Sequence, residues 1–351
     1  MRPFVPHLIK LLSFSVFTFY SVSSHPVNEL SDFAAHPEYS NAKISPGGDY
    51  LAVGVRHEGK RALAVLDLET KTPISLTGFY DKSEVGGYTW VNEDRLVLSI
   101  VRQRGALERP GSIGELYAVD ANGKRGKYVF GYQAKDPIYA AGRILDYIDD
   151  KHILIETAPF GNVAGKDRLT EVYKLNVYSG KRKKIIRSDL RGANFIVDSN
   201  KEPRLAIGMD DSSEQIMSFR ETGELTWRHF PSPFIGDVIP VSFVEENKAL
   251  YVIAAAPMDQ TVKGLYQLDL ETKEYSQVFH AGDTDVVAPF VSREGELYGL
   301  GVERHYPEFI AVNENHELTT VTQALFSSFG GANVFITSTT EDKSKLVFEV
   351  S

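Results

Sequence analysis

Short apolar strands alternate with polar turns along this chain, and this strand–turn–strand pattern occurs seven times. The clearest copy has an apolar strand at 42–44, a Ser-Pro-Gly-Gly-Asp turn at 45–49, and further strands at 50–55 and 62–68. Copies follow one another every 46 to 57 residues, which is the period of a four-stranded propeller blade. The turns of the seven copies are centred at Gly47, Glu93, Asp150, Asn200, Glu246, Glu294 and Asp342.

The outer hairpins repeat as well, since the segment 66–71 returns almost letter for letter at 268–273. No long stretch shows a helical period, so we predict an all-β propeller of about seven four-stranded blades over residues 42–351. The seventh copy reaches Ser351 after its second strand. We therefore expect a last blade that is incomplete after about two strands, with an open edge through which the protein can form oligomers.

The first residues are typical of an export signal. Arg2 and Lys10 precede an apolar run at 11–22, and small residues then fit cleavage before His25. The run is too short to span a membrane, which takes about 20 residues. We predict a signal peptide at 1–24, a lead-in segment at 25–41, no membrane span after cleavage, and a periplasmic or secreted protein.

Composition narrows the classes of function. Of 351 residues, 42% are hydrophobic and 24% are charged, as in ordinary globular proteins. The net charge of -9 lacks the basic balance of a nucleic-acid binder, so we expect no nucleic-acid partner. The absence of cysteine excludes disulfides, thiolate metal sites and a cysteine nucleophile. Nothing in the pattern indicates a cofactor.

Several segments resemble the N-terminal propeller of prolyl-oligopeptidase-family serine peptidases, meaning the acylaminoacyl-peptidase and dipeptidyl-peptidase-like members. They are Ile44–Ala52, Leu63–Leu68, Trp90–Val97 and Glu115–Asp120. The resemblance covers roughly residues 33–351 and is densest before residue 125. It implies a propeller that shields a partner active site and filters substrates by size.

In that family an α/β-hydrolase domain carries the Ser-Asp-His triad. Its nucleophile needs a Gly-x-Ser-x-Gly elbow, and no glycine of this chain is followed two residues later by serine. No catalytic residue is therefore carried over, and we expect no enzyme activity from the chain alone. The resemblance favours a truncated or split form, partnered by a separately encoded α/β-hydrolase domain or by a peptide substrate.

The alternative is a self-contained periplasmic propeller that binds a ligand or a protein, or a lactonase-like propeller enzyme. Such an enzyme needs ionisable or metal-binding groups that converge on the central channel. The inner strands offer mainly apolar residues, which argues against the enzyme.

Metal sites are not predicted. The pairs His57-Glu58 and His316-Glu317 begin like a metalloprotease helix, but both lack the second histidine, and we place both in hairpins. The acidic segment 210–214 offers oxygen ligands for calcium, yet a solvated hairpin tip is favoured.

Candidate binding residues come from the long connections between the second and third strands of the copies, because function tends to lie on long loops over a rigid scaffold. These connections run over 102–114, 158–170, 257–264 and 302–307. The alternative is that their charges only solvate the hairpins. The candidates for contact with a partner or an anionic group are Arg102, Arg104, Arg109, Arg168, Arg304 and His305.

Overall fold

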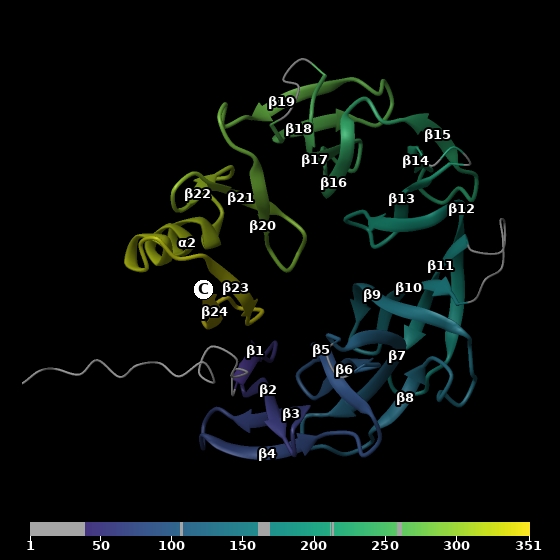
Figure 1. The fold of residues 1–351 in the computed structure, drawn as a ribbon, viewed down its shortest axis with the longest axis vertical. Coiled ribbons are helices and arrows are strands. Elements are labelled where there is room, and N and C mark those ends of the chain that lie inside the picture. Colours follow the sequence, from purple (N-terminus) through teal and green to yellow (C-terminus); the bar gives the residue numbers. More distant parts are fainter. Residues whose placement is uncertain (1–38, 106–107, 161–168, 211, 213, 258–261) are drawn as a thin grey trace, which may run out of the picture. The chain divides into compact units, whose positions relative to one another are not determined.

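The computed structural model describes residues 39–351 except 106–107, 161–168, 211, 213 and 258–261. Residues 38–351 form one compact unit, which is the one described below. The predicted signal peptide at 1–24 lies outside the described residues, as does nearly all of the lead-in segment. Figure 1 shows that the regular secondary structure of the described residues is almost entirely β-strand.

The first two sheets are four-stranded antiparallel meanders, in strand order β1-β2-β3-β4 and β5-β6-β7-β8. The turn at 45–49 between β1 and β2 was expected from its Gly-Gly-Asp sequence, and Gly48 adopts the positive φ that favours glycine. The strands are β1 (Tyr39–Ile44), β2 (Tyr50–His57), β3 (Lys60–Asp67), β4 (Thr72–Thr77), β5 (Ser83–Asn92), β6 (Arg95–Arg102), β7 (Gly111–Asp120) and β8 (Lys127–Phe130).

The third and fourth copies share one sheet of seven strands, because β12 (Arg182–Val197) is long enough to serve both. Its first half pairs with β11 and its second half with β13, with a register shift between Arg191 and Asn194. The other strands are β9 (Ala140–Asp149), β10 (His152–Pro159), β11 (Leu169–Asn176), β13 (Pro203–Met209), β14 (Gln215–Phe219) and β15 (Arg228–Pro231).

The remaining sheets have four, three and two strands. The fifth copy forms the order β16-β17-β18-β19, the sixth β20-β21-β22, and the seventh β23-β24. The strands are β16 (Ile235–Val244), β17 (Ala249–Ala255), β18 (Gly264–Asp269), β19 (Tyr275–Phe279), β20 (Val286–Val291), β21 (Leu297–Glu303), β22 (Pro307–Ala311), β23 (Val334–Thr339) and β24 (Leu346–Val350).

Helix α2 (Glu317–Ser328) corrects two expectations. A helix follows β22, where the repeat predicted a fourth strand, and His316 is its N-cap rather than a hairpin residue. The His316 ring accepts a hydrogen bond from the amide of Leu318 at 3.2 Å and stacks on Tyr298 at 4.9 Å. The residue therefore anchors the helix to its sheet, while His57 lies at the end of β2, beside the β2–β3 turn, as expected.

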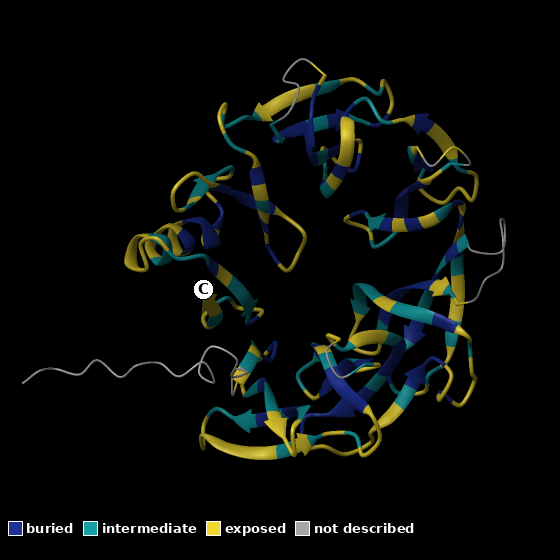
Figure 2. Cartoon of the chain, in the orientation of Figure 1, coloured by how far each residue is buried: buried dark blue, intermediate teal, exposed yellow. Residues whose placement is uncertain are grey.

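Figure 2 shows buried residues along the strands of the sheets, and side chains from consecutive sheets pack together. Leu63 and Val65 of the first sheet pack with Trp90 and Leu98 of the second. The same relation joins the sheet of β16–β19 to the sheet of β20–β22, through Ile253 and its neighbours. Sheets that stack face to face in chain order define a propeller-like all-β fold, and burial of these faces stabilises it. That fold class is confirmed.

The first and last sheets also contact each other. The Thr337 hydroxyl donates to the carbonyl of Ala42 at 2.9 Å, and the amide of Glu341 donates to the carbonyl of Pro46 at 2.9 Å. The succession of sheets therefore returns to its start. Among the described residues β24 pairs with β23 alone, and the expected association through its edge stays a prediction.

Candidate functional site

A cavity of about 930 Å³, here called the central cavity, lies mainly between the second and third sheets. Its walls come from β5, β6 and β7 and from β9 and β10, and they are completed by single residues of β1 and β12 and by the turns after β12 and β20. A second cavity of about 760 Å³ shares four of its lining residues, so the two adjoin. The shared residues are Asp146, Lys201, Glu294 and Gly295.

Charged side chains line the central cavity, which differs from the apolar inner strands expected from the sequence. Arg143 and Asp146 both lie on β9; Arg143 reaches a partner on β10, and Asp146 reaches one in the turn between β12 and β13. Arg143 pairs with Glu156 at 3.0 Å, and Lys201 pairs with Asp146 at 3.1 Å. The second Glu156 oxygen accepts the buried amide of Phe195 at 2.8 Å, so this carboxylate is held from two sides.

The acid at the turn between β20 and β21 is held ionised. Burial alone raises the pKa of Glu294. Hydrogen bonds from its own backbone amide and from Ser292 lower that pKa, as do the charges of Lys343 and Arg293. These effects outweigh burial, so the pKa lies below its ordinary value. The three acids of the central cavity are therefore all engaged by hydrogen bonds or cations.

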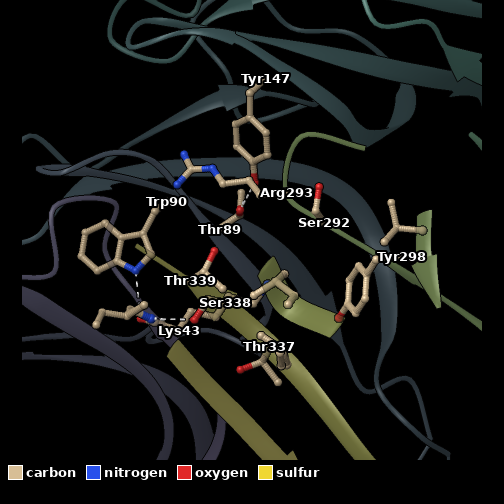
Figure 3. Close-up of a pocket in the computed structure, with 14 residues that line it drawn as sticks. Lys43, Thr89, Trp90, Tyr147, Ser292, Arg293, Tyr298, Thr337, Ser338 and Thr339 are labelled. Carbon is tan, nitrogen blue, oxygen red and sulfur yellow. Dashed lines mark hydrogen bonds between the residues drawn. The ribbon is translucent and has the colours of Figure 1, made fainter. Parts of the chain in front are cut away.

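A smaller cavity of about 240 Å³, here called the closure cleft, lies where the first and last sheets meet (Figure 3). It shares Lys43, Thr89, Tyr147 and Arg293 with the central cavity. Hydroxyl groups from β5 and from β23 line it, together with the Trp90 ring.

Two cations line the closure cleft: Arg293, whose ion pair is long, and Lys43, whose side chain reaches toward Tyr88 of the central cavity. The Arg293 guanidinium lies 6.0 Å from the centre of the Tyr147 ring, and its nearest acid is the exposed Glu341 at 3.9 Å. Lys43 has no ion pair among the described residues, and its Nζ lies 6.0 Å from the centre of the Tyr88 ring. Burial lowers the pKa of Lys43, because the charged ammonium is partly removed from water.

The sequence-predicted residues lie elsewhere. Arg102, at the end of β6, pairs with Asp81 at 3.0 Å, and Arg304 pairs with Asp283 at 3.1 Å and Glu308 at 2.9 Å. These arginines are already neutralised by local acids. The others are exposed in their loops or lie outside the described residues: Arg104, Arg109 and His305 are exposed, and Arg168 falls in the segment 161–168.

The five described candidates come from two separate loops, and none of them lines the three cavities. The residues that do line them were missed because the sequence does not show which side of an inner strand faces the centre. One signal was present, since Arg143 and Asp146 are charged residues inside an otherwise apolar strand.

Metal ligands were not predicted, and the part of the chain that the structure describes holds no group of three or more His, Asp or Glu side chains placed to bind a metal ion. Within the acidic segment at 210–214, residues 211 and 213 lie outside the described residues. No helix among the described residues is long and apolar enough to cross a membrane.

Comparisons with known proteins find neither a matching family model nor a matching curated protein. Among solved structures, the chain is similar to a prolyl endopeptidase, with 13% identity and a TM-score of 0.47 over 77% of this chain and 38% of that chain. It is also similar to the acylaminoacyl peptidase of Pyrococcus horikoshii, with 12% identity and a TM-score of 0.43 over 86% of this chain and 48% of that chain. A third similar structure is TolB from Acinetobacter baumannii, with 13% identity and a TM-score of 0.39 over 81% of this chain and 69% of that chain.

The chain spans less than half the length of both peptidases. At these identities the comparisons assign no activity to it. What the described residues define is a class, the all-β proteins with a propeller-like arrangement of sheets.

Proposed function

We propose that this chain is an exported, non-catalytic β-propeller whose centre admits peptides and limits which of them reach a hydrolase active site on a partner. The hydrolase lies on a further domain or on a separately encoded protein, as in a split or truncated peptidase. The place of action is the periplasm or the cell exterior, and nucleic acid is not a partner.

Seven blades are part of the proposal. The seven-stranded sheet divides at Arg191, where β12 changes partner from β11 to β13, and this yields two blades. The sixth blade then has α2 in the place of its fourth strand, and the seventh consists of β23 and β24. Each of the seven repeats found in the sequence corresponds to one such blade.

The observation that carries the proposal is the lining of the central cavity. Peptides present amide groups and charges of both signs, so a passage for varied peptides needs polar walls without one dominant charge. The pairs Arg143–Glu156 and Lys201–Asp146 place charges of both signs in a wall that is otherwise largely apolar. The cavity and its neighbour together offer space for an extended chain but not for a folded domain.

The same pairs support a non-catalytic role. A general base or nucleophile in the cavity needs a group that is free to accept a proton or to attack a substrate. Glu156 and Asp146 are each held by a cation, and Glu156 also accepts a backbone amide. We therefore assign these carboxylates to the structure of the channel wall.

Binding and turnover measured on one sample test the proposal. Short peptides, acetylated and amidated at their ends, are incubated with the purified chain, and equilibrium dialysis with mass spectrometry follows both the bound fraction and any cleavage. We expect binding without cleavage, and exclusion of a folded domain of similar composition. Cleavage of the peptides, or the absence of any binding, would contradict the proposal.

The alternative, a self-contained propeller for a ligand or an envelope protein, predicts a different outcome. Recovery of one specific ligand or protein with no affinity for varied peptides would favour it, and lactone hydrolysis by the pure chain would favour the enzymatic version.

A further inference from the structure

We infer that the closure cleft binds the carboxylate of a peptide C-terminus, held between Arg293 and Lys43. The inference rests on the proposed function, because the peptide reaches the cleft through the central cavity with which the cleft shares four lining residues. It adds a position at which one end of the peptide is recognised.

The balance of charge around the cavities is the first argument. Arg143 and Lys201 are each matched by a carboxylate at 3.0–3.1 Å. Lys43 has no such partner among the described residues, and the carboxylate nearest to Arg293 is 3.9 Å away on an exposed side chain. A partly buried ammonium without a counter-ion costs free energy, which a bound anion would recover.

The hydroxyls of the cleft are the second argument. The Ser338 Oγ accepts the amide of Ile44 at 2.9 Å, so its own hydrogen is free to donate. Thr89 shares one hydrogen bond with the Tyr147 hydroxyl, and since either oxygen can be the donor, one of the two hydrogens stays available. Figure 3 shows Arg293, Tyr147 and Thr89 on one side of the cleft, with Ser338 and Thr339 on the other.

Size and shape favour a carboxylate on a small residue over a larger anion. The cleft has a volume of about 240 Å³, which suits the terminal residue of a peptide and not a folded partner. The Trp90 and Tyr298 rings form apolar walls, and a guanidinium forks onto the two oxygens of a carboxylate. A peptide end supplies the anion and a side chain for these walls.

Fluorescence of Trp90 gives a direct test, because the chain has two tryptophans and the Trp227→Phe variant isolates the one in the cleft. An acetylated tripeptide with a free C-terminal carboxylate, its C-terminal amide, and inorganic phosphate are titrated into this variant. We expect a saturable change with the carboxylate form and at least about tenfold weaker binding of the amide and of phosphate.

Variants assign the residues. Arg293→Gln and Lys43→Met should each weaken carboxylate binding by about tenfold or more, while Arg293→Lys and Lys43→Arg restore part of it. Lys135→Met, which removes an exposed lysine that lines none of the three cavities, is the matched control and should change nothing. Thermal melting of every variant confirms that it is folded.

Four outcomes overturn the inference. Equal binding of the peptide acid and the peptide amide would show that the cleft does not recognise a carboxylate. A response to phosphate without a response to the peptide acid would show that the cleft binds a different anion. Peptide binding in the central cavity with no preference for a free C-terminus would refute this site and leave the proposed function standing. Loss of all peptide binding would refute both.

Discussion

The amide of Ile44 donates a 2.9 Å hydrogen bond to the Oγ of Ser338, a residue 294 positions further along the chain. Ile44 ends β1 in the first sheet, and Ser338 lies on β23 in the last. The bond therefore joins the two ends of the succession of sheets, beside the cleft that we assign to a carboxylate.

The Ser338→Ala variant should weaken this closure. Loss of one partly buried hydrogen bond lowers the free energy of unfolding by about 1 kcal/mol, because the amide of Ile44 is left without its partner. Urea unfolding measures the loss, and amide exchange at Ile44 should accelerate. Ser327→Ala, which removes a hydroxyl bonded only within α2, is the control; equal effects of the two variants would contradict a special role for the closure.

Asp120 should be among the most costly residues to truncate. It accepts from the buried Arg95 guanidinium at 2.7 Å, and the same guanidinium donates to the carbonyl of Val177 in the neighbouring sheet at 2.9 Å. Asp120→Ala leaves Arg95 buried without its counter-ion, so we expect a loss of about 3–5 kcal/mol in unfolding free energy.

The matched control for Asp120 is Asp67→Ala, since Asp67 is also an aspartate at a strand end but holds only its own turn, through Thr70. Its loss should cost less than the loss of Asp120, because it removes hydrogen bonds within one turn only. A similar cost for both variants would show that the buried ion pair adds no stability.

Acid should loosen the turn between β23 and β24. Hydrogen bonds from the Thr340 hydroxyl, the Ser344 amide and the Ser344 hydroxyl lower the pKa of Asp342 to about 2. Because the pKa of this carboxyl is lower in the folded state, the ionised carboxylate stabilises the folded state at any pH above its unfolded-state pKa, about 4. This stabilisation is lost as the pH falls through the folded-state pKa of about 2.

Unfolding measured from about pH 5 to about pH 2 tests this turn. The wild-type chain should lose more stability over that range than Asp342→Ala, which lacks the titrating group. Parallel losses in the two proteins would contradict the assignment of this carboxyl.

Lys43 should reduce the stability of the free protein. Burial lowers its pKa in the folded state, so the folded state is penalised wherever the lysine is charged, and the penalty fades as the pH rises toward the ordinary value of 10.5. Lys43→Met should therefore be more stable than the wild type at neutral pH, by up to about 1 kcal/mol. Chemical unfolding should show that the difference in stability between Lys43→Met and the wild type shrinks as the pH approaches 10.5. If Lys43→Met is less stable than the wild type at neutral pH, the result would count against a lysine charge that is buried for binding.

The strands were predictable because alternation of apolar and polar residues is a local signal. The turns at Gly47 and Asp342 lie where the sequence placed them. Helix α2 was missed since its sequence, rich in Thr and Val near the start, has weak helical preference, and its cap is a histidine rather than Ser, Thr, Asp or Asn.

The candidate site was much less predictable. Whether Arg102 and Arg304 are available depends on Asp81 and Asp283, acids about 20 residues away that only the fold brings to them. In the same way, the pairing of Asp146 with Lys201 joins β9 to the turn between β12 and β13. Such pairings follow from register and packing between sheets, and repeats in a single sequence carry little information on either.

The central claim is that peptides enter between the inner strands. Because the chain has no cysteine, a single one can be placed at Asn194, which is exposed in the central cavity, or at Ser276, which is exposed on the outer strand β19. The measurement is the rate of maleimide alkylation at each position, with and without a short capped peptide. The peptide should slow alkylation of Asn194→Cys and leave the rate at Ser276→Cys unchanged; equal rates at Asn194→Cys with and without peptide would contradict entry of peptides between the inner strands.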